Sequence, residues 1–97
     1  MLHQLALPAI TDDLVERIAA NDAVLLQHAS VWAIWEGHQD NLKIQRLQDK
    51  GCQLYVLQDN LRSFGINPDQ ILAGIALIDY PAWVALTVEN PVIMTWN

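Results

Sequence analysis

Five short segments rich in apolar residues are spaced along this chain, and polar or turn-forming residues separate them. The second, third and fourth of these segments contain uninterrupted apolar runs rather than an apolar–polar alternation. Such runs are typical of strands buried on both faces of a parallel sheet. The predicted strands are Met1–Leu7, Ala23–Leu26, Cys52–Leu57, Ile75–Ile78 and Val92–Trp96.

Helical spacing marks the segments between these strands. The first predicted helix runs to about Ala20 and carries apolar residues at three- and four-residue intervals, at Ile10, Leu14, Val15 and Ile18. In a second helix over 39–50, Leu42 and Leu47 are expected to face inward, and Gly51 is expected to end it. Further helical segments are predicted at 30–35, 59–64 and 81–88.

Strands therefore alternate with helices from one end of the chain to the other. This alternation implies right-handed crossovers and helices on both faces of the sheet. No linker, internal repeat or low-complexity stretch interrupts it. We predict an α/β fold in which residues 1–97 form a single domain, with a mainly parallel five-stranded sheet flanked by helices on both faces.

The composition adds an expectation about the surface. Apolar residues make up 53% of the chain and charged residues 16%, whereas globular averages are about 45–50% and about 25%. In so small a protein this excess suggests that a partner covers part of the surface, although an apolar-rich core is the alternative. Aromatic residues are enriched at interface cores. The candidate interface residues are Trp32 and Trp35, three positions apart on one helix face, and Trp83.

Polar residues follow three of the predicted strands directly. They are Gln27 and His28, Gln58 and Asp59, and Asp79 and Tyr80. Ligands of open parallel sheets tend to bind beyond the carboxyl ends of the strands. We therefore predict a polar crevice that contains His28, Asp59, Asp79 and Tyr80. The alternative is that these side chains only cap helices and satisfy turns.

Several kinds of chemistry find no support in the sequence. Eleven acidic against five basic residues give a net charge of -6, which disfavours direct binding to phosphate backbones. The chain has no glycine-rich phosphate-binding motif. His3, His28 and His38 are not spaced as metal ligands. We predict no catalytic, cofactor-binding or metal-binding residue.

The expected location is the cytoplasm. The apolar runs are far shorter than the roughly 20 residues of a membrane helix, and Met1–Leu7 lacks the basic start and cleavage site of a signal peptide. A single cysteine excludes an internal disulfide and weakly favours a reducing compartment.

Cys52 is the one residue able to carry sulfur. It follows Gly51 at the start of a predicted strand, on the opposite side of the sheet from the predicted crevice. Reactive cysteines usually lie at a helix N-terminus or beside a cation. Lys50 is the nearest cation in sequence, but the position favours a buried, inert thiol.

Segments along essentially the whole chain resemble the TusB/DsrH family, and they are closer to the TusB branch than to DsrH of sulfur oxidisers. Each segment alone is only weakly specific for the family, but the order and spacing of all the segments together are more specific. The segments are Met1-Leu2-His3, Asp22-Ala23-Val24-Leu25-Leu26-Gln27, Tyr55-Val56-Leu57, Ile78-Asp79-Tyr80 with Trp83, and Trp96 near the C-terminus.

The resemblance implies a DsrE/DsrF/DsrH-like fold and a heterohexamer with TusC- and TusD-like paralogues. Such a complex accepts persulfide sulfur from a TusA-like protein and passes it to a TusE-like protein, towards 2-thiouridine at the tRNA wobble position. The persulfide cysteine belongs to the TusD-like subunit. DsrH proteins carry a cysteine near the end of the first helix, where this chain has Ile18-Ala19-Ala20.

That departure favours a non-catalytic subunit, and two alternatives stay open. One is a sulfurtransferase that carries a persulfide on Cys52. The other is a stand-alone domain that binds a small ligand through His28, Asp59 and Asp79.

Overall fold

The computed structural model describes residues 1–97, and its central feature is one five-stranded sheet. Every neighbouring pair of strands is parallel, and the strand order is β4-β3-β2-β1-β5. The strands are β1 (Leu2–Leu5), β2 (Ala23–Leu26), β3 (Gln53–Leu57), β4 (Ile75–Ile78) and β5 (Ile93–Trp96). The predicted α/β fold with a mainly parallel five-stranded sheet is confirmed.

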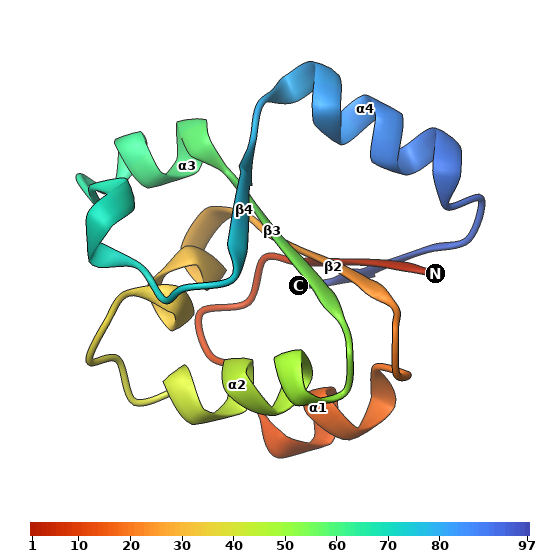
Figure 1. The fold of residues 1–97 in the computed structure, drawn as a ribbon, viewed down its shortest axis with the longest axis horizontal. Coiled ribbons are helices and arrows are strands. Elements are labelled where there is room, and N and C mark those ends of the chain that lie inside the picture. Colours follow the sequence, from red (N-terminus) through yellow and green to blue (C-terminus); the bar gives the residue numbers. More distant parts are fainter.

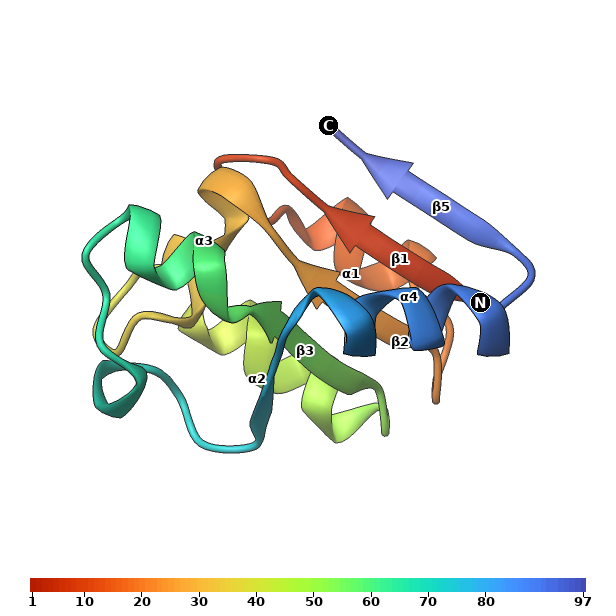
Figure 2. The same ribbon diagram turned by 90° about the horizontal axis from the view of Figure 1, so that it is seen from above.

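Helices cover the two faces of this sheet unequally. They are α1 (Asp12–Arg17), α2 (Asn41–Asp49), α3 (Gln58–Ser63) and α4 (Tyr80–Glu89), with 3-10 helices η1 (His28–Ile34) and η2 (Pro68–Gln70). The chain adds β2, β3 and β4 in one direction and then returns to place β5 beyond β1. With right-handed crossovers, the returning connection must use the opposite face. Accordingly α4 lies on one face and α1 and α2 on the other (Figures 1 and 2).

The hydrophobic core is divided by the sheet into two parts of different size. The larger part lies against α1 and α2 and contains 18 buried residues. The smaller part lies beneath α4 and contains only Leu2, Ala23, Leu25 and Leu86. On that face the side chains of β3 and β4 are only partly buried, as at Tyr55, Leu57 and Ile78. This chain alone therefore leaves the α4 face of the sheet incompletely covered.

The first helix is shorter than its apolar spacing predicts. It begins at Asp12, and the N-cap Thr11 Oγ1 accepts a hydrogen bond from the Leu14 N–H (3.2 Å). It ends at Arg17 and not near Ala20, because Ile18 adopts an extended backbone with φ −80° and ψ 120°. Lys50 Nζ donates to the Ile18 carbonyl (2.7 Å), and so satisfies an acceptor that the helix end leaves free. Ile18 is nevertheless buried, as its spacing predicts.

The inner face of α2 differs from the prediction at one position. Leu42 is 71% exposed, so the expectation that it faces inward is wrong. Ile44 and Leu47 are fully buried instead. Residues three apart share a helix face, whereas residues two apart do not. Ile44 and Leu47 therefore define the buried side, and Leu42 points away from it.

A glycine turn links α2 to β3. Gly51 has a positive φ of 84°, and a Cβ placed there would lie 2.5 Å from Asn21 Oδ1. The Gly51 N–H donates to the Gln48 carbonyl and the Cys52 N–H to the Leu47 carbonyl. These two bonds form a Schellman motif, which ends the helix where the sequence predicts.

Candidate functional site

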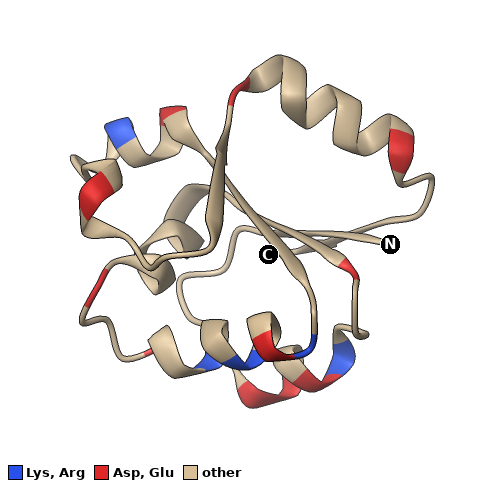
Figure 3. Ribbon diagram, viewed as in Figure 1, with Lys and Arg blue, Asp and Glu red and all other residues tan.

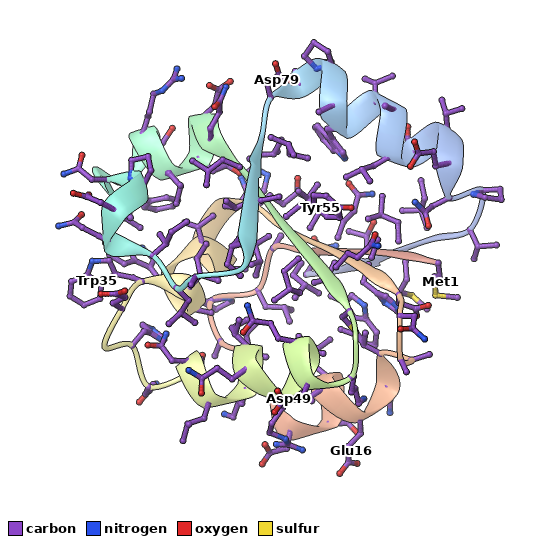
Figure 4. The ribbon with its side chains drawn as sticks, viewed as in Figure 1. Met1, Glu16, Trp35, Asp49, Tyr55 and Asp79 are labelled. Atoms are coloured by element: carbon purple, nitrogen blue, oxygen red, sulfur yellow. The ribbon has the colours of Figure 1, made fainter.

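The carboxyl ends of β2, β3 and β4 surround a cavity of about 340 Å³, here called the crevice. Its lining includes all four residues of the predicted polar crevice, namely His28, Asp59, Asp79 and Tyr80. The other lining residues are Gln27, Leu57, Asn60, Ile78 and Trp83. Figure 4 shows Asp79 at the point where β4 passes into α4. The fold therefore brings the four predicted side chains together, and their binding of a ligand stays a prediction.

The polar side chains of the crevice also serve the local fold. Asp79 is the N-cap of α4, and its Oδ1 accepts a hydrogen bond from the Ala82 N–H (3.0 Å). Asn60 Oδ1 accepts from the His28 N–H (2.8 Å), and this bond helps to hold His28 at its positive φ of 52°. Asp59 pairs with Arg62 one turn along α3 (3.3 Å). Capping and a crevice are therefore compatible roles for these residues.

Two aromatic side chains of α4 form one wall of the crevice. The rings of Tyr80 and Trp83 meet edge to face, with centroids 5.5 Å apart and planes at 84°. Trp83 is half-buried over the sheet, and its indole N–H donates to Gln4 Oε1 (3.1 Å). That bond fixes the orientation of the Trp83 ring. Trp83 thus contributes to the interior of the chain, and its predicted role at an interface stays a prediction.

The outer side of α4 presents an apolar strip to solvent. Tyr80, Val84 and Val88 follow one another at four-residue intervals and are all exposed, Val88 by 77%. We call these three residues the α4 stripe. The helix carries no charge before Glu89, whereas α1 and α2 are dense in charged side chains (Figure 3). A helix that is apolar on its outer side is typical of a surface that a partner covers.

A second exposed group of aromatic side chains lies on η1 and α3. The ring of Trp32 meets Trp35 edge to face at 6.0 Å and Phe64 at 5.9 Å. Trp35 and Phe64 are exposed, and Figure 4 shows Trp35 at the rim of the molecule, away from Asp79. The predicted adjacency of Trp32 and Trp35 is correct. Phe64 is a member that sequence spacing did not indicate.

Cys52 lies just before β3, in the larger core and away from the crevice. It is 8% exposed, and its Sγ lies 3.4 Å from the Ala19 carbonyl oxygen. Burial raises the pKa of the Cys52 thiol, and the neighbouring Asp22 carboxylate raises it further. A reactive thiol requires the opposite shift, because the thiolate is the nucleophile. The geometry agrees with the predicted inert thiol.

A polar cluster that the sequence pattern does not indicate links β1 to β5 and to the residue that precedes β2. His3 is only 2% exposed, and its Nε2 lies 2.8 Å from Asp22 Oδ2. The Trp96 indole N–H donates to His3 Nδ1 (3.1 Å). Because Nδ1 accepts, the proton of a neutral His3 resides on Nε2, which donates to Asp22. We call these three residues the β1 clasp.

The charge state of Asp22 follows from this cluster. Burial disfavours the carboxylate, but the hydrogen bond from His3 and the nearby N-terminal ammonium group outweigh burial. The net effect lowers the pKa of Asp22 below its ordinary value. The sequence signal for this cluster is weak, because its members lie 19 and 93 residues apart along the chain.

No three His, Cys, Asp or Glu side chains come close enough to hold a metal ion. His3, His28 and His38 have different partners. His3 bonds to Asp22, the His28 N–H donates to Asn60, and His38 Nδ1 accepts from the Asp40 N–H (3.0 Å). None of the helices combines the length and apolar character needed to cross a bilayer.

The fold and surfaces together define a class of protein: a small parallel α/β domain with an apolar helix face, a polar crevice and a buried cysteine. Comparison with known proteins narrows this class. The sequence profile of the DsrH-like proteins matches residues 8–92, and the chain therefore belongs to this family. The resemblance noted in the sequence is confirmed.

Relatives of known name match over their full length. Protein TusB from Pectobacterium parmentieri is 35% identical over 99 residues, which span 99% of this chain and 100% of the relative. Protein TusB from Escherichia coli strain K12 is 34% identical with the same coverage. A solved structure of a protein of unknown function from Methanobacterium thermoautotrophicum has a TM-score of 0.72. It covers 98% of this chain and 96% of its own at 12% identity, so this likeness supports the fold alone.

Proposed function

We propose that this chain is a non-catalytic subunit of a cytoplasmic sulfur-relay complex, assembled with TusC- and TusD-like paralogues into a heterohexamer. The complex takes persulfide sulfur from a TusA-like protein and hands it to a TusE-like protein, towards 2-thiouridine at the tRNA wobble position. The observation that carries the proposal is the full-length similarity to proteins named TusB, at 34–35% identity.

The uneven covering of the sheet supports a role as a subunit. On the α4 face the core contains only four buried residues, and the α4 stripe of Tyr80, Val84 and Val88 is exposed. An exposed apolar surface of this kind is stable in water when a partner removes it from solvent. We assign the α4 stripe to an interface with a paralogue, and the group of Trp32, Trp35 and Phe64 to a second contact.

The state of Cys52 supports a role without sulfur chemistry. A persulfide carrier must meet an incoming sulfur donor, and Cys52 is buried with a raised thiol pKa. The resemblance to the TusB branch implies that the persulfide cysteine belongs to a TusD-like partner, and we propose that this chain contributes surface and stability. A sulfurtransferase that uses Cys52 would have to open the larger core in each cycle.

The basic residues of α2 support indirect action on tRNA. Arg46 pairs with Asp12 (2.8 Å), and Lys43 lies 3.4 Å from Asp40. Lys50 is bound to backbone carbonyls of the first helix and its end. Cations already held by carboxylates and carbonyls make a poor phosphate-binding surface, and the net charge of -6 opposes it further.

The test is co-expression of the tagged chain with its TusC- and TusD-like paralogues, followed by native mass measurement of what co-purifies. We expect one assembly that contains all three chains. Recovery of the tagged chain alone as a monomer, with both paralogues soluble in the same extract, would refute the proposal.

Two variants locate the interface. Val84→Glu combined with Val88→Glu places charge on the α4 stripe, and we expect the assembly to be lost while the circular dichroism spectrum is unchanged. Leu42→Glu is the control, because Leu42 is an exposed apolar residue (71%) that lies on α2 instead. Equal loss of assembly in both proteins would show that α4 is not the specific contact.

Cys52→Ser tests the non-catalytic role in the same system. We expect the assembly to form and 2-thiouridine to appear in a strain that lacks the wild-type chain. Normal assembly without thiolation would instead assign the sulfur chemistry to Cys52.

A further inference from the structure

The crevice contains an unusual combination of groups for a cavity of its size. Asp59 and Asp79 are the two acidic residues in its lining. Leu57 and Ile78 supply apolar surface between them. No Lys or Arg lines the crevice. Its lining is therefore anionic, with an apolar floor.

Both carboxylates can still accept from a ligand. Asp79 uses Oδ1 to cap α4 and has no protein partner at Oδ2. Asp59 pairs only with Arg62, at 3.3 Å and with both side chains more than 70% exposed. Exposed pairs of this kind contribute little free energy. A ligand cation can therefore replace Arg62 at Asp59 at small cost.

The aromatic wall favours the same charge. The face of a Trp ring attracts cations, and so does that of a Tyr ring. Trp83 is held by its hydrogen bond to Gln4 and by its edge-to-face contact with Tyr80. A ring that is already held in place loses little entropy when a ligand packs on it. Carboxylates beside a fixed aromatic wall form a cation site rather than an anion site.

Anion binding at the start of α4 is disfavoured for a separate reason. The N-terminus of a helix attracts anions through its free N–H groups. Here Asp79 already occupies the Ala82 N–H, and Pro81 has no N–H to offer. The other four Lys and Arg side chains lie on α1, on α2 or directly after α2, across the sheet (Figure 3). Nothing near the crevice other than Arg62 and His28 supplies positive charge.

We propose that the crevice binds a guanidinium or primary ammonium group on a short aliphatic stem. The cation lies between Asp59 and Asp79 against Trp83, and the stem packs on Leu57 and Ile78. A volume of about 340 Å³ accommodates a group of this size. The source is either the side chain of an Arg or Lys in a bound protein or a free small molecule. This proposal is independent of the proposed function, because it uses only the residues that line the crevice.

The test is an NMR titration of the ¹⁵N-labelled chain with N-acetyl-arginine amide and with N-acetyl-lysine amide. The uncharged isostere N-acetyl-citrulline amide is the control ligand. We expect saturable shifts at crevice amides, including those of His28, Asn60 and Trp83, with either cation. Equal shifts with the citrulline compound, or no saturable shift with either cation, would overturn the proposal.

Variants connect the binding to the two carboxylates. We expect Asp59→Asn and Asp79→Asn each to raise the Kd about three- to tenfold. Both should fold normally, because Asn caps a helix about as well as Asp at position 79 and because the Asp59 side chain is exposed. Asp69→Asn, which removes a carboxylate outside the crevice, is the matched control. An equal loss of affinity in the Asp69→Asn protein would mean that only the net charge of the chain matters, and it would overturn the proposal.

The assembled complex separates the two sources. If a side chain of a partner fills the crevice, N-acetyl-arginine amide binds the isolated chain and not the complex. If the natural ligand is a free molecule, the compound binds both. Either result supports the site, and failure of the complex to form leaves the titration of the isolated chain as an independent test.

Discussion

His3 and Asp22 are buried or nearly so at the amino ends of the strands, yet each has a partner. His3 bonds to both Asp22, which directly precedes β2, and Trp96, which lies on β5. It therefore links these two parts of the chain. Buried polar groups are costly only when they lack hydrogen bonds, and no buried side-chain nitrogen or oxygen of this chain lacks one. The β1 clasp thus joins the first strand to the last, and its hydrogen bonds and ion pair outweigh the cost of burying the Asp22 carboxylate.

The clasp predicts how stability depends on pH. Because the pKa of Asp22 is lower in the folded chain than its ordinary value of 3.8, the carboxylate stabilises the fold above that value. This contribution is lost as the pH falls through the folded-state pKa. We expect Asp22→Asn to lower the free energy of unfolding by about 1 kcal/mol at neutral pH, since Asn keeps the acceptor but not the charge.

The measurement is urea denaturation of both proteins at several values between about pH 6 and about pH 3. We expect the wild type to lose more stability than Asp22→Asn over this range, so that the difference between them shrinks on acidification. Asp69→Asn serves as a control for the loss of an exposed acid. A difference that is constant with pH would contradict the role of the Asp22 charge.

Single residues differ in how well the sequence predicted them. Leu47 was predicted to be buried from its spacing, and it is. The prediction for Leu42 is wrong because it rests on hydrophobicity alone. The buried side of α2 is set by Ile44 and Leu47, and Leu42 lies on a different side of the helix. His3 could not be recognised, because its partner Trp96 comes from the far end of the chain and only tertiary structure brings them together.

Among the elements, α2 and α4 show how position in the sheet order decides a helix surface. In α2, two fully buried residues face the larger core and the remaining side chains are mostly polar. In α4, Leu86 is the only fully buried residue, although the helix is almost entirely apolar. An apolar helix that buries so little of itself indicates that something outside the chain covers the rest.

This contrast predicts effects of very different size for two substitutions on α4. Leu86→Ala empties a buried position beneath the helix, and we expect it to lower the free energy of unfolding by about 2–3 kcal/mol. Val88→Ala removes an exposed side chain, and we expect a change within about 0.5 kcal/mol. Chemical denaturation of the isolated variants measures both values. Comparable losses in the two variants would show that Val88 is packed within the chain.

The type and order of the elements were predictable, but their ends were not. Continuous apolar runs identified β2 and β3, which have a strand on each side. The apolar run of β4 was expected to be buried on both faces, but β4 is an edge strand and its Ala76 and Leu77 are exposed. The segment 30–35 was expected to be a short helix, and η1 begins earlier, at His28, with 3-10 geometry. The end of α1 depends on Lys50, more than 30 residues away, so no local pattern could indicate it.

For the whole molecule, one topological fact explains both candidate surfaces. The return from β4 to β5 carries α4 alone onto one face, and that crossing starts at Asp79, beside the ends of β2 and β3. The crevice and the α4 stripe therefore meet at Tyr80. The crevice was predictable, because parallel strands place their carboxyl ends at one edge of the sheet. The Tyr80–Trp83 wall was not, because it depends on the packing of α4.

The sheet order also predicts a gradient of amide exchange across the molecule. We expect β2, which has a strand on each side, to exchange most slowly, and the edge strands β4 and β5 to exchange faster. Assembly with the paralogues should slow exchange in α4 and leave β2 unchanged, because a partner protects the surface that it covers. Hydrogen–deuterium exchange measured by mass spectrometry on the isolated chain and on the complex tests this. If assembly slowed exchange in α2 and not in α4, the partner would cover the charged face, and the uncovered side of the sheet would need another explanation.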